Sequence, residues 1–394
     1  PSVPLVIAKL FGKHTVCTVH GLNWKVDKWG GFASAYLKLG ERVAAKYADD
    51  LVVLSESEWN YFQEKYDSPE WNASARRIAE QFSGGSPESF QPLRADGNHL
   101  TYRFSTAGKA YLLRIDPGGI EDDYMLAESS VMRLLHEQGL PVPNVLETDI
   151  SLREFPFRWQ IMEFVSHPCL NTFAKAGTLK RQSIARQAGT FLARLHAFRF
   201  PGFGFLNTDE LQKSGNLQGL DATCLDYFRK RLAVHLEYLL HHGFLSESEY
   251  GTVNALFSRA ESLLKFGKGS LLHRDFTFWN MLGTESELAA VIDWDDCVIG
   301  DPMDDLGIVN CFQDKEFMEE LIASYAEFTP IGRQERTRIA LHTLRNMLWK
   351  TMIRDYMGYF EKGNDFFLAT AGESLRETTV RRLKSAIREL EEQI

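Results

Sequence analysis

Cysteines are few in this sequence, and their spacing excludes both a disulfide framework and a zinc site. No two of the five stand in a Cys-x-x-Cys pair. Scattered cysteines are typical of free thiols in a reducing compartment, so we expect a cytoplasmic protein. The five are Cys17, Cys169, Cys224, Cys297 and Cys311.

The sequence also lacks a long apolar run and an excess of positive charge. No stretch approaches the roughly 20 apolar residues that a membrane-spanning helix needs. Val3–Leu10 is too short for a signal peptide. The net charge of -9 argues against non-specific nucleic-acid binding, which draws on a basic surface. We therefore expect neither a membrane nor a nucleic acid as partner.

What the chain does contain is one highly informative stretch, residues 271–305. Two leucines predict the end of a buried strand, and a polar loop follows directly. The loop reads His273-Arg274-Asp275-Phe-Thr-Phe-Trp-Asn280. Its spacing, His-x-Asp-x-x-x-x-Asn, is typical of the catalytic loop of kinases.

A predicted hairpin follows this loop. Residues 283–287 indicate the turn, and Leu288–Ile292 is a run of small and branched apolar residues that ends abruptly at Asp293. We expect the hairpin to bring Asn280 and Asp293, which are distant in sequence, to one place.

These residue types suit phosphoryl transfer from a nucleoside triphosphate. The reaction needs a carboxylate near the acceptor hydroxyl and oxygen ligands for Mg²⁺ against the phosphates. Asp275 would take or orient the hydroxyl proton, and Asn280 and Asp293 would hold the metal. The plainer alternative is a buried His273 bound to a backbone carbonyl, with the other residues only shaping turns. The combination of loop, hairpin and strand-terminal Asp favours the chemical interpretation.

Two further segments complete the pattern, namely Ile292-Asp293-Trp294-Asp295-Asp296 and Gly300-Asp301-Pro302. With the loop, they resemble the aminoglycoside phosphotransferase family of small-molecule kinases, over about residues 72–394. A protein kinase would instead show Asp-Phe-Gly at the second metal ligand and a later Ala-Pro-Glu, and neither is present. The family usually has Gly where Arg274 stands, so the acceptor side of the loop is expected to differ.

The resemblance implies an α+β fold of two lobes, like that of protein kinases. A small antiparallel-sheet lobe would span residues 90–166 and a large helical lobe residues 167–394. ATP or GTP would bind between them with Mg²⁺. His273 would brace the catalytic loop through hydrogen bonds, and Arg274 would neutralise developing charge or touch the acceptor.

The small lobe should supply the nucleotide contacts. Arg114 lies on the strand where kinases place a phosphate-clamping cation, and Glu128 on the next helix would pair with it. The alternative is a solvated Arg and a surface Glu. A hairpin around Gly97 and Asn98 could present backbone N–H groups to phosphates, or could be an ordinary Asp-Gly turn.

The segment between the lobes should contact adenine through its backbone, around Glu163 and Val165. Further along, six carboxylates are concentrated near the predicted metal site. They could attract a cationic substrate, or several could cap helices, and capping is favoured for Asp301. The six are Asp293, Asp295, Asp296, Asp301, Asp304 and Asp305.

Residues 1–67 do not fit a kinase. Strands at Thr15–Val19 and Asp50–Leu54, with a helix between them, predict a parallel pair. Thr18-Val19-His20-Gly21-Leu22-Asn23-Trp24 resembles part of a retaining glycosyltransferase of the two-Rossmann-domain type. The nucleotide-sugar domain of that family is absent, so we interpret His20 as a structural loop residue. Residues 68–89 would form a linker and a first helix. Self-association through this N-terminal α/β extension is a further hypothesis.

The sequence therefore predicts an ATP- or GTP- and Mg-dependent phosphotransferase acting on a small-molecule hydroxyl. An aminoglycoside antibiotic would suit an acidic cleft and would imply antibiotic resistance. Choline, amino alcohols and sugars are alternative acceptors for the same fold. A nucleotide-binding module without activity is a further alternative.

Overall fold

The computed structural model describes residues 16–19, 50–53, 69–93, 99–116, 124–363, 366–368 and 372–394. The chain divides into two compact units, Pro1–Gly85 and Ser86–Ile394.

The first unit contains a parallel pair of strands and a helix. Strand β1 (Val16–Val19) pairs with β2 (Asp50–Val53) in parallel. The predicted strand positions and their parallel pairing are therefore confirmed. Helix α4 (Pro69–Ser83) closes the unit and includes the predicted first helix. The helix expected between the strands, and His20, lie outside the described residues.

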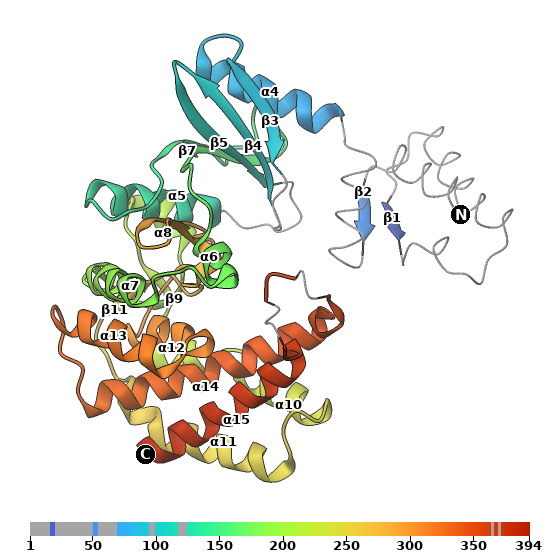
Figure 1. Cartoon of the computed structure of the whole chain (residues 1–394). Coiled ribbons are helices and arrows are strands. Elements are labelled where there is room, and N and C mark those ends of the chain that lie inside the picture. The colour runs from blue at the N-terminus through green and yellow to red at the C-terminus, as the bar shows by residue number, and fades with distance from the viewer. Residues whose placement is uncertain are drawn as a thin grey trace, which may run out of the picture. The chain divides into compact units, whose positions relative to one another are not determined.

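The second unit begins with a five-stranded antiparallel sheet in the order β3-β4-β5-β7-β6 (Figure 1). Along β5 the side chains alternate, because Leu113 and Ile115 are fully buried on one face while Arg114 lies on the other. Helix α5 (Tyr124–Glu137) contacts β6 and β7. The strands are β3 (Ser89–Leu93), β4 (Leu100–Thr106), β5 (Lys109–Asp116), β6 (Val145–Asp149) and β7 (Arg158–Glu163).

The larger part of this unit is mainly helical, as predicted, and it also contains short strands. Five of them form a second antiparallel sheet in the order β10-β9-β14-β11-β8, and β12 pairs with β13 in the predicted hairpin. The strands β8, β9, β10 and β14 are two to four residues long, which is too short for a periodicity signal. They are β8 (Arg199–Phe200), β9 (Phe203–Leu206), β10 (Gly219–Asp221), β11 (Gly269–Leu272), β12 (Met281–Gly283), β13 (Leu288–Val291) and β14 (Val298–Gly300).

Helices make up the rest of the large lobe. The residue pattern of 227–242 predicts a single helix, but the chain is interrupted at Arg231, whose φ of 58° is left-handed and incompatible with a continuous right-handed helix. The helices are α6 (Leu170–Ala176), α7 (Arg181–Leu195), α8 (Thr208–Ser214), α9 (Cys224–Arg229), α10 (Leu232–His241), α11 (Glu247–Ala260), α12 (Met303–Phe312), α13 (Lys315–Ala326), α14 (Arg333–Tyr356) and α15 (Leu375–Gln393), with 3-10 turns η2 (Glu261–Leu264), η3 (Phe278–Asn280) and η4 (Tyr359–Glu361).

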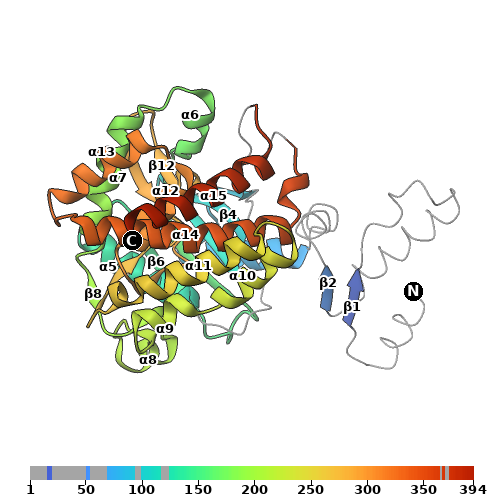
Figure 2. The same ribbon diagram turned by 90° about the horizontal axis from the view of Figure 1, so that it is seen from below.

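Helix α14 is the central element of the large lobe. It packs against α12 on one side and α15 on the other, and Figure 2 shows α14 and α15 running side by side.

Two hydrophobic clusters fill the interior, and Trp294, just after the β12–β13 hairpin, has no exposed surface. None of the helices in the described part of the chain combines the length and apolar character that crossing a bilayer requires.

The close approach of α7 and α13 depends on Gly189. A Cβ at this position would lie 2.3 Å from the carbonyl oxygen of Leu321 and 3.0 Å from the Cβ of Ser324. We predict that Gly189→Ala lowers the free energy of unfolding by about 1–3 kcal/mol, because the backbones must separate. Urea unfolding measures this change.

Gly251 in α11 is the matched control, because nothing lies within 4 Å of a Cβ built there. Gly251→Ala should raise the free energy of unfolding by roughly 0.5–1 kcal/mol, as alanine favours a helix over glycine. Equal effects of the two substitutions would contradict the packing described for α7 and α13.

Candidate active site

A buried carboxylate from α12 holds the start of the predicted catalytic loop. Asp305 has no exposed surface, and its two oxygens accept the backbone N–H groups of His273 and Arg274 at 2.9 and 2.8 Å. The Nε2 of His196 lies 3.1 Å from the same carboxylate. Both backbone groups at the turn are therefore satisfied, which fixes the direction in which the loop leaves β11.

His273 joins this loop to the tip of β13. Its Nε2 lies 2.9 Å from the carbonyl oxygen of Ile292, and its Nδ1 accepts the backbone N–H of Asp275 at 3.2 Å. A carbonyl can only accept, so the ring proton is assigned to Nε2. The ring is fully buried. These contacts fit the expected bracing role, and they assign His273 to positioning rather than to proton transfer.

Arg274 differs from its expected placement. Its guanidinium donates to Asp304 at 2.7 Å and to Asn346 at 3.0 Å, so it lies in a buried network between α12 and α14 rather than facing an acceptor. Its φ of 71° is left-handed, a conformation that glycine adopts at little cost. The ion pair with Asp304 helps to offset the strain of a side chain at this position.

Asp275 is the carboxylate at the centre of the loop. One oxygen accepts the indole N–H of Trp279 at 3.0 Å and the side-chain amide of Asn280 at 2.9 Å, while the other lies 3.3 Å from the Nζ of Lys350. Burial alone would raise the pKa of Asp275, but Lys350 and Trp279 outweigh it and hold the pKa below its ordinary value. The group is therefore an oriented, ionised carboxylate.

The β12–β13 hairpin places Asn280 next to the strand tip that carries Asp293. Met281 pairs with Val291, and the backbone N–H of Ile292 donates to the carbonyl of Asn280 at 2.9 Å. The side-chain N–H₂ of Asn280 is bound to Asp275, which identifies its other terminal atom as an oxygen acceptor. Asp293 itself is left-handed, with a φ of 67°, a strained conformation common at functional sites.

Negative charge accumulates beside this hairpin. Partial burial and the nearby Glu128 and Asp275 raise the pKa of Asp293, although Arg114 opposes the rise. Burial, followed by Asp293 and Glu128, raises the pKa of Asp295 to about 8. Such mutual repulsion is relieved when a cation binds. Within the described residues no group of three or more His, Cys, Asp or Glu side chains is arranged to hold a metal.

Arg114 and Glu128 form the predicted ion pair across β5 and α5. The Glu128 carboxylate also accepts a hydrogen bond from the side-chain amide of Gln160 at 2.9 Å. Arg114 is 8% exposed and Glu128 is 1% exposed. The alternative of a solvated Arg and a surface Glu is therefore wrong. Arg114 lies 3.8 Å from Asp293, so the cation reaches from the small lobe to the hairpin tip. Burial and Arg114 lower the pKa of His99, which contacts the same guanidinium, to about 4.

The other predicted nucleotide contacts are less well defined. Gly97 and Asn98 lie outside the described residues. Strand β7 ends at Glu163, whose backbone N–H donates to the carbonyl of Asn144 at 2.9 Å. Val165 follows two residues later, between the sheet and α6. Their assignment to adenine stays a prediction.

Three of the six concentrated carboxylates do not face a cleft, contrary to the acidic substrate site that the sequence suggested. Asp301, Asp304 and Asp305 are at most 2% exposed. Asp301 accepts from Arg338 at 2.7 Å and from the backbone N–H of Met303 at 3.1 Å. The expected capping contact is present, but the carboxylate also serves an internal ion pair.

Sequence reasoning missed Lys350 and Asn346, which come from α14. It named Asp305 of α12 among the concentrated carboxylates, but not as the group that holds the loop. A lysine in an amphipathic helix carries no sequence signal that distinguishes it from a surface lysine, and its contact with Asp275 spans 75 positions. Only the packing of α14 against the loop brings it there.

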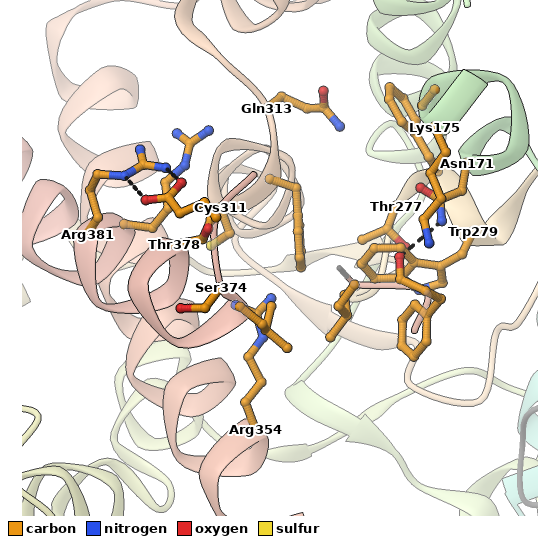
Figure 3. Close-up of a pocket in the computed structure, with 18 of the residues that line it drawn as sticks. Asn171, Lys175, Thr277, Trp279, Cys311, Gln313, Arg354, Ser374, Thr378 and Arg381 are labelled. Carbon is orange, nitrogen blue, oxygen red and sulfur yellow. Dashed lines mark hydrogen bonds and ion pairs between the residues drawn. The ribbon is translucent and has the colours of Figure 1, made fainter. Parts of the chain in front are cut away.

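A cavity of about 1160 Å³ opens beside the catalytic loop (Figure 3). Thr277, Phe278 and Trp279 form part of one wall, and residues of α14 and α15 form another. Phe367 lines this cavity and contacts the Trp279 ring edge-on at 5.3 Å. Tyr356 is 72% exposed.

The small antiparallel sheet, the loop after β11 and the carboxylate at the end of β13 define a phosphotransferase of the protein-kinase-like class. Comparison with known families agrees, because residues 89–340 match the model of the phosphotransferase enzyme family APH. The chain belongs to this family. It is thus a phosphotransferase.

Solved structures support the same fold. A thermostable mutant of aminoglycoside phosphotransferase APH(4)-Ia, in ternary complex with AMP-PNP and hygromycin B, matches with a TM-score of 0.57 and 17% identity over 80% of this chain and 98% of that one. A putative fructosamine-3-kinase from Haemophilus somnus 129PT matches with a TM-score of 0.53 and 17% identity over 83% and 99%. At such identities the likeness extends to the fold alone.

The N-terminal unit has a separate match, since residues 4–79 correspond to a domain of unknown function, DUF1972. No curated protein matches the chain by sequence.

The buried network beneath the loop predicts a pH dependence of stability. Burial by itself would raise the pKa of Asp304, but Arg274, His342 and Arg345 outweigh it and lower the pKa to about 2. A carboxyl group with a lowered pKa stabilises the fold above its unfolded pKa of roughly 4, and this contribution is lost as the pH falls toward 2.

We predict that Asp304→Asn lowers the free energy of unfolding by about 3 kcal/mol at pH 7, because it leaves Arg274 without its buried partner. The deficit relative to wild type should shrink as the pH falls from 4 to 2. Urea unfolding at several pH values measures it, with the exposed Asp209→Asn as control. A deficit that is independent of pH would contradict the assigned ion pair.

Proposed function

We propose that the protein transfers the terminal phosphoryl group of ATP, with Mg²⁺, to a hydroxyl group of a small molecule. The observation that carries the proposal is the grouping around Asp275, an ionised carboxylate bonded to Asn280 beside the strand tip of Asp293. Three of the oxygen-bearing groups that phosphoryl transfer needs thus come from one loop and one hairpin. A GTP donor has no comparable support, since the solved relatives carry AMP-PNP or ADP.

Asn280 and Asp293 are the residues that would hold the metal. The Asn280 carboxamide has its N–H₂ engaged by Asp275, and the raised pKa of Asp293, caused by burial and neighbouring carboxylates, reflects negative charge without full compensation. One amide oxygen and one carboxylate are ligands of the kind that suit Mg²⁺. When bound, Mg²⁺ supplies charge neutralisation for the phosphates.

Arg114, fixed by Glu128, would align the phosphates from the small-lobe side. Asp275 would orient the acceptor hydroxyl and receive its proton as the new bond to phosphorus forms. Its lowered pKa makes it a weak base, so its main contribution is orientation until late in the transfer. Arg274, His273 and Asp305 are positioning residues, because their contacts serve the loop itself.

The identity of the acceptor and the cellular location have less direct support. An acidic cleft would favour an aminoglycoside as the acceptor, but Asp301, Asp304 and Asp305 are buried and paired and so do not line one. The described cysteines are free, which fits the reducing cytoplasm. Self-association through the N-terminal unit stays a hypothesis.

Replacing the central carboxylate tests the proposal. Asp275→Ala should reduce phosphoryl transfer by roughly 100- to 10,000-fold, the usual contribution of a positioned acid–base group. ADP release in the presence of an acceptor measures the rate. Unchanged thermal unfolding and unchanged nucleotide affinity would show that the fold survives. Retained turnover would remove Asp275 from the mechanism, and a wild-type protein that binds ATP without any turnover would favour the inactive-module alternative.

The phosphate-clamping role of Arg114 gives a second prediction. Arg114→Met should weaken the binding of Mg·ATP by roughly 10- to 100-fold, because a charge-assisted hydrogen bond to phosphate is worth about 1.5–3 kcal/mol. Isothermal titration measures the affinity. Arg153→Met is the control and should bind normally, since Arg153 is an exposed arginine in the connection between β6 and β7 of the same sheet. Equal affinities for wild type and Arg114→Met would contradict the role.

A further inference from the structure

The cavity beside the catalytic loop carries a strongly basic lining. Its charged residues in the described part of the chain are five cations and one carboxylate, namely Lys175, Arg181, Arg354, Arg381, Arg382 and Glu373. This excess contrasts with the net charge of -9 of the whole chain. An acidic protein that gathers cations around one cavity has a local potential that favours anions.

Two of the five cations are already neutralised. Arg381 donates twice to Glu373, at 3.1 and 2.7 Å, and Arg181 donates to Asp314 at 2.7 Å. The remaining three have no carboxylate within ion-pair distance among the described residues. These are Lys175, Arg354 and Arg382. Figure 3 shows Arg354 on one side of the cavity and Lys175 on the other.

Arg354 is the most informative of the three because it is only 7% exposed. Its guanidinium donates to the hydroxyl of Thr379 at 2.8 Å and lies 5.6 Å from the centre of the Phe312 ring. Burial lowers the pKa of Arg354 to about 10. A buried guanidinium without an anionic partner is costly to maintain, and a bidentate donor of this kind suits phosphate or carboxylate.

The basic lining is continuous with the catalytic carboxylate. The Phe312 ring lies 4.8 Å from the Nζ of Lys350, which in turn lies 3.3 Å from Asp275. Trp279 lines the cavity and donates its indole N–H to Asp275. A molecule in the cavity would therefore lie next to the group that orients the acceptor hydroxyl.

We propose that the cavity binds the acceptor and that this acceptor is an anion, a hydroxyl compound that also carries a phosphate or carboxylate group. The inference rests on the proposed phosphotransferase function and adds the substrate class. Arg354 and Arg382 would bind the oxyanion, while the hydroxyl extends past Trp279 toward Asp275. A polycationic acceptor would be repelled by the same lining.

Inorganic sulfate probes the oxyanion site without knowledge of the acceptor. The full-length protein is first saturated with Mg·ADP, so that sulfate cannot occupy the phosphate positions of the nucleotide. Titration followed by calorimetry should then give saturable binding of sulfate in the millimolar range. Arg354→Met and the less buried Arg382→Gln should each weaken it at least tenfold. The matched control is Arg388→Gln, an exposed arginine of the same helix as Arg382 that does not line the cavity.

The outcomes separate clearly. Sulfate binding that is lost in Arg382→Gln and restored in Arg382→Lys supports the site even if Arg354→Met fails to fold. Absence of saturable binding up to about 50 mM sulfate overturns it. Binding that both arginine variants leave unchanged is an adventitious ion only, and also overturns it.

Matched acceptors complete the test and distinguish the two oxyanions. Four compounds are compared by ADP release, namely glucose, glucose 6-phosphate, glucuronate and glucosamine. Glucose 6-phosphate, which carries a phosphate, or glucuronate, which carries a carboxylate, should inhibit sulfate binding or be phosphorylated. Glucosamine should do neither. Efficient phosphorylation of glucosamine with no effect of either arginine variant on KM overturns the inference while leaving the phosphotransferase intact. Absence of nucleotide binding would instead overturn the proposed function, whatever sulfate does.

Discussion

The hydrogen bonds that Asp305 and His273 make to the catalytic loop are the constraint on which the rest of the site depends. Asp305 fixes the two backbone groups at the start of the loop, and His273 ties the loop to the carbonyl of Ile292, the residue before Asp293. Neither side chain needs to touch a substrate. Without these hydrogen bonds the loop would not be fixed relative to the hairpin tip, and Asp275 would not be held near Asp293.

The acidic segment after β13 shows how one run of charges can serve two purposes. Asp293 and Asp295 lie beside Glu128, where their raised pKa values, caused by burial and mutual repulsion, indicate a place for a cation. The later members of the run turn inward and pair with arginine and histidine side chains of α14. The inward group stabilises the lobe, whereas Asp293 of the outward group lies 3.8 Å from Arg114 of the small lobe. Local negative charge therefore says little about the acceptor.

Much of the fold and part of the site could be predicted from sequence, for identifiable reasons. The strand-loop-hairpin unit from β11 to β13 is contiguous, so its spacing carries the geometry directly. The pairing of Arg114 with Glu128 was predictable because strand alternation and helix position are local patterns. By contrast, Arg231 breaks a helix through a left-handed φ that its residue type does not favour, and very short strands such as β8 lack a periodic signal.

Contacts between distant segments were beyond sequence reasoning. The orientation of Arg274 is decided by Asp304 and Asn346, which only the packing of α12 against α14 brings to it. Lys350 reaches Asp275 for the same reason, and the basic lining of the cavity gathers residues from four helices. The run of carboxylates along the chain left open whether they attract a cationic substrate or cap helices, and only the folded arrangement shows that Asp301, Asp304 and Asp305 are buried.

The central claim is that Asn280 and Asp293 converge on one divalent cation beside Asp275. Crystals grown with Mn²⁺ and AMP-PNP test it most directly, because the anomalous signal of manganese locates the ion itself. The account predicts a peak coordinated by the side chains of both Asn280 and Asp293 and by phosphate oxygens. A peak that contacts only one of these side chains, or an ion bound elsewhere with the nucleotide in place, would contradict it.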